Sequence, residues 1–239
     1  MSNKIRMLNG DARIALALWF RKAKRIFNTI RVFRRKKVFV IGLNKTGTTT
    51  MAKALRDLGY LVGSEEDAKS LFDAWAKRDF KKIVRFCKSA QAFQDSPFSF
   101  PFTYVVLDYA FPGSKFILTV RDDDQQWYRS ITRFHSKLWA DGDGVPPTKK
   151  QLQEAFNSYK GRPWDVNREL FETPEEDPYN EAILKDFYNR HNSNVIAYFR
   201  KRPNDLLVIN VGETGSYSKF IDFLGIRSRF SDFPWENRT

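Results

Sequence analysis

A loop with two glycines, set between an apolar segment and a helix-like one, constrains the fold of this chain more than any other feature. Residues 37–43 have the composition of a buried strand, and residues 48–58 that of the helix behind it. Between them, Gly42 and Gly47 enclose four residues. Small residues at this spacing let backbone N–H groups turn toward an anion, and the helix N-terminus adds partial positive charge. The loop therefore predicts a phosphate-binding strand-loop-helix unit.

Strand-like and helix-like segments alternate along the rest of the chain. Further strands are expected over residues 60–62, 91–94, 115–120 and 205–210. Helices are expected over residues 102–111, 125–139 and 181–199, with two charged helices in 65–88 and a last helix that ends at Leu224. This alternation predicts a three-layer α/β/α domain on a mostly parallel sheet. Residues 139–180 are rich in proline and turn residues, which predicts an excursion from that sheet.

The net charge of +13 is concentrated at the N-terminus. Residues 1–37 carry twelve Lys and Arg and one acid, a net +11, so the other 202 residues carry +2. An apolar stripe at helical spacing crosses this region: Trp19, Ala23, Ile26, Ile30 and Phe33. We expect residues 1–36 to form a basic amphipathic helical arm on a domain spanning residues 37–239. Such a helix can pack on the body or a second copy, contact a membrane through residues 13–36, or bind nucleic acid, the least favoured of these partners.

Cysteine and histidine are scarce. Cys87 is the only cysteine and cannot form an internal disulfide, and with two histidines no Cys/His metal site is expected. No apolar stretch approaches the roughly 20 residues of a membrane-spanning helix. A basic run follows the short apolar stretch 14–20, where a signal peptide would carry its cleavage site. We therefore expect a metal-independent, cytoplasmic protein, peripheral at the inner face of the membrane if the arm binds lipid.

The lysine of the loop is displaced from its place in nucleotide-hydrolysing P-loops. Those loops carry lysine directly after the second glycine, whereas this chain has Thr48 there and Lys45 two residues before Gly47. Lysine, threonine, glycine and two threonines after an apolar strand resemble the loop of sulfotransferases, which transfer a sulfuryl group from 3′-phosphoadenosine 5′-phosphosulfate (PAPS). The resemblance implies a P-loop-like fold and a loop that holds the 5′-phosphosulfate. The residues so implied are Lys45, Thr46, Gly47, Thr48, Thr49 and Thr50.

A second segment resembles the signature with which the same family binds the 3′-phosphate. An apolar strand ends in Arg121, and a helix then supplies Ser130. The resemblance implies that these two side chains bind the 3′-phosphate, Arg121 as a fork and Ser130 as a short donor. Their separation is one residue longer than is usual, so Arg129 is an alternative to Ser130. Weaker matches continue to Arg238, and the resemblance covers the chain from about residue 37 to its end.

The general base and the site that binds the acceptor substrate are less closely defined by the sequence. Asp95, two residues before Pro97, stands where cytosolic sulfotransferases carry a histidine base, so the resemblance implies Asp95 as the general base. Capping of the following turn is the structural alternative for Asp95. His135 and His191 are expected in packing or surface roles. The acceptor site is expected from residues 98–104 and 139–180, whose aromatic side chains suit a glycan, a lipid-linked glycan or a small molecule.

The sequence thus predicts a sulfotransferase that releases 3′-phosphoadenosine 5′-phosphate (PAP) as it transfers the sulfuryl group to a hydroxyl or amine. Two alternatives stay open. One is a P-loop phosphotransferase or kinase, which the position of Lys45 disfavours. The other is a nucleic-acid-binding or membrane-binding protein that acts through the basic arm.

Overall fold

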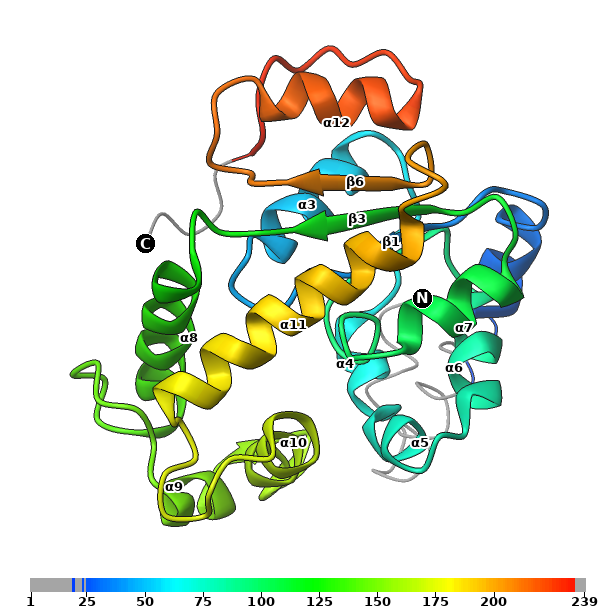
Figure 1. Ribbon diagram of the computed structural model, residues 1–239. Coiled ribbons are helices and arrows are strands. Elements are labelled where there is room, and N and C mark those ends of the chain that lie inside the picture. Colours follow the sequence, from blue (N-terminus) through cyan, green and yellow to red (C-terminus); the bar gives the residue numbers. More distant parts are fainter. Residues whose placement is uncertain (1–18, 20–22, 24, 235–239) are drawn as a thin grey trace, which may run out of the picture.

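A four-stranded sheet forms the centre of the computed structural model, which describes residues 19, 23 and 25–234 (Figure 1). Its strands are β1 (Val38–Val40), β2 (Ala92–Phe93), β3 (Lys115–Thr119) and β6 (Leu206–Ile209). Their order is β2-β1-β3-β6, and every neighbouring pair is parallel. The predicted α/β fold on a parallel sheet is confirmed.

Helices cover both faces of the sheet because apolar side chains alternate across each strand. On one face, Val38, Val40 and Ile117 pack with residues of α3 (Thr48–Asp57) and α12 (Ser216–Leu224). On the other face, Phe39, Phe116 and Leu118 pack with α7 (Thr103–Ala110) and α11 (Glu181–Phe199). Figure 1 shows α12 and α3 on one side of the strands and α11 crossing the other. These are the three expected layers.

The region before β2 differs from its prediction in two ways. Three short helices replace the two expected: α4 (Glu65–Lys69), α5 (Phe72–Ala76) and α6 (Phe80–Cys87). The strand expected over residues 60–62 is reduced to a single bridge between Val62 and Ala92. The chain leaves the sheet at this point because the Ser64 side chain accepts the Asp67 N–H and so begins α4 at once.

The excursion predicted over residues 139–180 contains two helices and a hairpin. The helices are α9 (Lys149–Glu154) and α10 (Arg162–Phe171), and the excursion follows α8 (Asp124–Trp139). The hairpin, which the sequence did not predict, pairs β4 (Phe156–Asn157) with β5 (Tyr159–Lys160). Among the described residues, no helix is long and apolar enough to cross a membrane.

Candidate active site

The loop between β1 and α3 is fixed by the close approach of its two glycines to neighbouring strands. A Cβ on Gly42 would lie 2.1 Å from Oγ1 of Thr119, at the end of β3. Gly47 has a φ of +101°, and a Cβ there would lie 2.4 Å from Cγ2 of Val211, just beyond β6. A larger residue at Gly42 would also meet the Thr119 backbone, and one at Gly47 would be strained by the positive φ. The loop is therefore set at the carboxyl edge of the sheet, where parallel α/β proteins bind their ligands.

Hydrogen bonds from outside the loop hold its backbone in place. Nε of Arg121 donates to the Lys45 carbonyl at 2.5 Å, and Nε1 of Trp127 donates to the Asn44 carbonyl at 2.9 Å. Thr46 is fully buried, and its hydroxyl donates to the Leu43 carbonyl at 2.6 Å. Unlike the other predicted loop residues, Thr46 lines neither of the cavities described below, so its side chain holds the loop and does not face a ligand.

A cavity of about 310 Å³ opens beside this loop. The predicted residues that line it are Lys45, Gly47, Thr48, Thr49, Thr50 and Asp95. Of the segments expected to form the acceptor site, 98–104 contributes Phe100, and the excursion contributes Trp139, Phe171 and Tyr179 among others. The cavity therefore joins the loop to the expected base and to a largely aromatic wall.

Lys45 occupies this cavity in a strained backbone conformation, with a φ of +70°. Its Nζ lies 3.9 Å from the centroid of the Phe134 ring, which places the ammonium over the aromatic face. Burial lowers the pKa of Lys45, and the nearby charges of Arg121 and Lys137 lower it further. The ammonium thus stands in a cationic, partly desolvated environment that a bound anion would relieve.

Asp95 is half-buried at the same cavity and also has a positive φ, of 63°. Burial raises its pKa to about 6, and the negative charge of Glu65 contributes to the rise. The Ser96 N–H donates to Oδ1 of Asp95 at 2.6 Å, and the Asn44 side chain also bonds to it. Asp95 therefore makes the turn contact expected of a cap, while its raised pKa and its position suit a general base near neutral pH.

A second cavity, of about 150 Å³, adjoins the first at Phe134, which lines both. Its wall includes four cationic side chains and no acid: Arg121, Arg129, Arg133 and Lys137. Ser130 also lines it, and the Ser130 hydroxyl is buried without a hydrogen-bond partner. An unpaired buried hydroxyl costs stability, and here it lies among cations. The arrangement suits an anion that would accept from Ser130.

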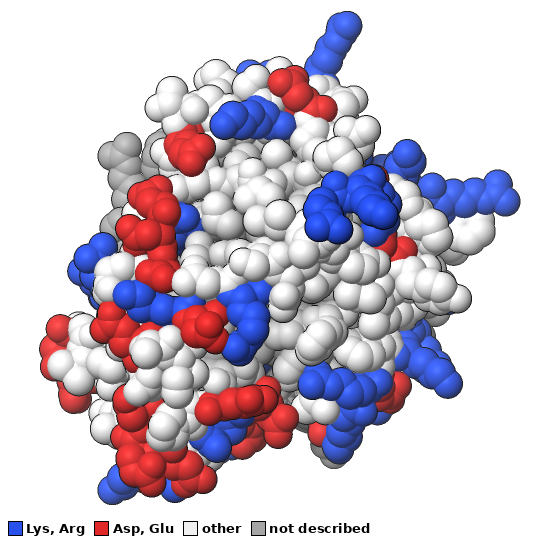
Figure 2. All heavy atoms as spheres, in the orientation of Figure 1, with Lys and Arg blue, Asp and Glu red and all other residues white. Residues whose placement is uncertain are grey.

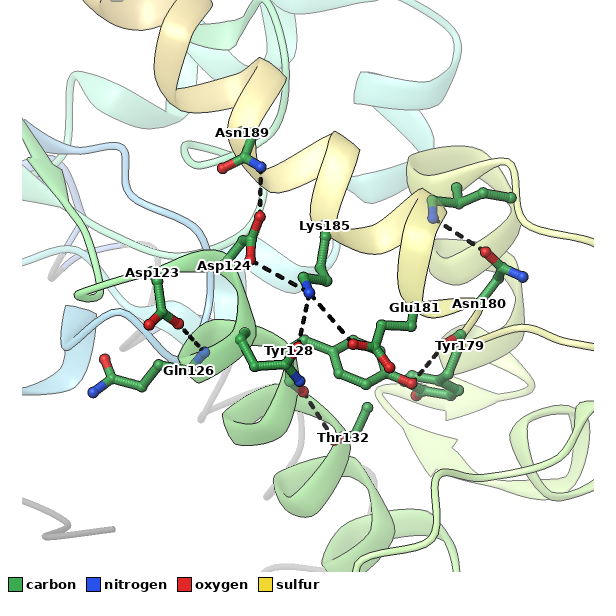
Figure 3. A network of polar contacts seen from close by, with 12 residues as sticks. Asp123, Asp124, Gln126, Tyr128, Thr132, Tyr179, Asn180, Glu181, Lys185 and Asn189 are labelled. Carbon is green, nitrogen blue, oxygen red and sulfur yellow. Dashed lines mark hydrogen bonds and ion pairs between the residues drawn. The ribbon is translucent and has the colours of Figure 1, made fainter.

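Three of these cations, Arg129, Arg133 and Lys137, lie on α8, which is held against α11. Lys185 of α11 donates to Gln125 at 2.7 Å and lies 3.5 Å from the Asp124 carboxylate, to which Asn189 donates at 2.7 Å (Figure 3). The Tyr128 hydroxyl donates to the Tyr179 carbonyl at 3.0 Å, one turn further along. The contacts fix the first turns of α8, so Ser130 and Phe134 are held toward the cavities.

The two histidines have different surroundings. His135 was expected in a packing or surface role, but it lines the first cavity, and its Nδ1 lies 2.7 Å from the Tyr179 hydroxyl. Burial and the charge of Lys45 lower the pKa of His135 to about 3, which keeps the ring neutral. His191 is buried, and its Nε2 lies 3.0 Å from the Ile41 carbonyl, as expected of a packing residue.

Sequence reasoning missed several residues of the two cavities. Arg133 and Lys137 were missed, although they continue a four-residue spacing from Arg129, the alternative to Ser130, and this spacing on one helical face was an available signal for a cationic surface. Glu65, Lys69 and Arg162 also line the first cavity. They come from α4 and α10, which only the tertiary fold brings to the loop.

In the part of the chain that the structure describes, no group of three or more His, Cys, Asp or Glu residues could hold a metal ion.

Comparison with known protein families identifies the family of this domain. A family model described as a sulfotransferase domain matches residues 37–239. The matched range contains Lys45, Asp95, Arg121 and Ser130 and leaves out the basic arm. No curated protein matches the chain.

Proposed function

The chain belongs to the sulfotransferase domain family, and from this we propose that it transfers a sulfuryl group from PAPS to a hydroxyl or amine of an acceptor. The observation that carries the choice of donor is the second cavity. There, the unpaired Ser130 hydroxyl and four cations lie beside the loop that holds Lys45. A donor with phosphates at both its 3′ and 5′ positions needs two such anion sites close together.

The residues present fit this donor. In the proposal, the loop residues Gly47, Thr48, Thr49 and Thr50 bind the 5′-phosphosulfate with the N-terminus of α3. Arg121 and Ser130 bind the 3′-phosphate, and Arg129 adds charge to the same cavity. Arg129 and Ser130, the two alternatives at the 3′-phosphate, line one cavity, and in the proposal they share this site.

Lys45 and Asp95 are the residues that act on the reacting groups. When bound, the donor supplies an activated sulfuryl group. As the acceptor oxygen or nitrogen bonds to sulfur, Asp95 takes the acceptor proton, and the bond between sulfur and the bridging oxygen breaks. Lys45 stabilises the negative charge that the leaving phosphate gains. The acceptor, which we take to be a glycan, a lipid-linked glycan or a small molecule, would occupy the aromatic side of the first cavity.

Binding of PAP tests the choice of donor before any acceptor is known. At a PAP concentration about a hundredfold above its Kd, we expect the melting temperature to rise by roughly 5–10 °C. AMP, which lacks the 3′-phosphate, and ATP with Mg²⁺ should give much smaller shifts. The measurement is differential scanning fluorimetry of the full chain. A shift with ATP and Mg²⁺ as large as that with PAP would instead favour the phosphotransferase.

Ser130→Ala tests the second cavity. We expect it to weaken PAP binding about tenfold or more, since a hydrogen bond to a charged phosphate is lost. The free protein should be at least as stable as wild type, because the substitution removes a buried hydroxyl that has no hydrogen-bond partner. Ser136→Ala is the matched control on α8, because the Ser136 hydroxyl accepts the Gly144 N–H at 3.1 Å and lines neither cavity. It should lower the melting temperature and leave PAP affinity unchanged in calorimetry. Equal PAP affinity in wild type and Ser130→Ala would remove Ser130 from the site.

A further inference from the structure

Part of the basic arm exposes an apolar surface. Residues 25–31 are helical, and the exposed fractions of Ile26, Phe27, Ile30 and Phe33 are 56%, 60%, 70% and 70%. Val32 is only 3% exposed and attaches this segment to the body. Packing of the apolar stripe on the body was one expectation from the sequence, and at Ile26, Ile30 and Phe33 the structure contradicts it. Trp19, another residue of the predicted stripe, is 61% exposed, and Ala23 is half-buried. Residues 13–18, 20–22 and 24 of the contact segment 13–36, and the arm before residue 13, lie outside the described residues.

Basic side chains surround these apolar residues. Residues 25–36 contain five Lys and Arg and no acid, and all five are exposed: Arg25, Arg31, Arg34, Arg35 and Lys36. The guanidinium of Arg31 lies 5.9 Å from the Phe27 ring, and that of Arg34 lies 5.4 Å from the Phe33 ring. Cations and apolar groups are therefore mixed on one surface, which we call the arm surface.

We propose that the arm surface binds the anionic headgroup region of a lipid bilayer. A second copy of the chain would bring an equal positive charge to the contact, and this repulsion disfavours self-association through the arm. Nucleic acid would neutralise the cations but leave Ile30 and Phe33 in water. An anionic membrane surface both neutralises the cations and removes the apolar side chains from water. Lipid phosphates pair with Lys and Arg, while acyl chains surround the apolar residues.

The arm surface lies away from the two cavities. It precedes β1, and Lys37 donates to the Ala90 carbonyl at the start of the sheet, whereas the cavities lie at the carboxyl edge beyond β1 and β3. In Figure 1 the blue segment lies beside α7, across the molecule from α8. Figure 2 shows Lys and Arg side chains projecting on that same side, while Asp and Glu side chains gather at the lower left. Membrane binding would thus leave the cavities open.

Vesicle sedimentation with the full chain tests the proposal. Vesicles of phosphatidylcholine and phosphatidylglycerol in equal parts should bind the protein, and vesicles of phosphatidylcholine alone should not. The double variant Ile30→Ser, Phe33→Ser should weaken binding about tenfold or more, since the apolar contribution is lost. The double variant Arg34→Gln, Arg35→Gln should weaken it about fivefold for each charge and reduce its dependence on salt. Melting temperatures should stay near wild type because all four side chains are exposed.

A matched control separates the arm surface from general surface hydrophobicity. Phe156 and Val145 are exposed to 74% and 62% and lie in the excursion, so the double variant Phe156→Ser, Val145→Ser should bind vesicles as wild type does. Equal binding to neutral and anionic vesicles would overturn the proposal, as would wild-type binding by the Ile30→Ser, Phe33→Ser variant. Displacement of the vesicles by duplex DNA would assign the arm surface to nucleic acid. A wild-type dimer that becomes a monomer in the Ile30→Ser, Phe33→Ser variant would assign it to a second copy of the chain. None of these outcomes bears on PAP binding.

Discussion

Replacing Lys45 with methionine is expected to lower kcat about a thousandfold. Methionine keeps much of the aliphatic stem over Phe134 but removes the ammonium that stabilises the leaving phosphate. Because this charge matters most in the transition state, kcat should fall far more than acceptor affinity. Steady-state kinetics with PAPS and an identified acceptor would measure both quantities.

Lys53→Met is the matched control for this substitution. Lys53 lies on α3, a turn and a half beyond the loop, where it pairs with Asp57 at 3.0 Å on the helix surface and lines neither cavity. Its kcat should stay within about twofold of wild type, because an exposed pair contributes little to stability and nothing to the reaction. A kcat for Lys45→Met close to that of Lys53→Met would remove Lys45 from the chemistry.

Asp95→Asn should also lower kcat, by about a thousandfold, since the amide cannot take the acceptor proton. In the wild type, kcat/KM should rise with pH through about 6, the pKa of Asp95, and level off above it as the carboxylate becomes the dominant form. The substitution should remove this rise. A pH profile that keeps the same inflection in Asp95→Asn would assign the titration to another group.

The free energy of unfolding tests whether burial destabilises the carboxylate of Asp95. Burial raises the pKa of Asp95 above its unfolded value, so the folded chain binds more protons between about pH 4 and 6. The contribution of Asp95 to the free energy of unfolding therefore falls as pH rises through this range and stays lower above it. At pH 8, Asp95→Asn should raise the free energy of unfolding by about 2 kcal/mol. The asparagine Oδ1 can still accept the Ser96 N–H, so this gain reports the cost of burying the carboxylate. Destabilisation of the variant in denaturant unfolding at pH 8 would show that the charged carboxylate stabilises the turn and that its pKa is not raised.

The elements that local pattern determines were predicted closely. The apolar run at 115–120 and the long helical segment at 181–199 correspond to β3 and α11. The single bridge at residues 60–62 and the β4–β5 hairpin were not predicted. These strand segments are only one or two residues long, and their pairing depends on tertiary neighbours. Local spacing carries too little information for such short pairings.

The same division holds for the candidate site. Lys45, Asp95, Arg121 and Ser130 were identified because their motifs are local, and the fold places them around two adjoining cavities. Thr46 was assigned to the donor on its motif, yet its hydroxyl is used within the loop. Arg162 could not be found from the sequence, because α10 reaches the first cavity only through the folding of the excursion.

Transfer of label from donor to acceptor tests the central claim most directly. One panel of glycans, lipid-linked glycans and small hydroxyl or amine compounds would be incubated with sulfur-labelled PAPS and, in parallel, with ATP labelled in its γ-phosphate plus Mg²⁺. We predict that sulfur label enters an acceptor, that PAP appears in equal amount, and that Lys45→Met lowers the rate of both about a thousandfold. Entry of phosphorus label, with no transfer of sulfur to any acceptor, would contradict the assignment.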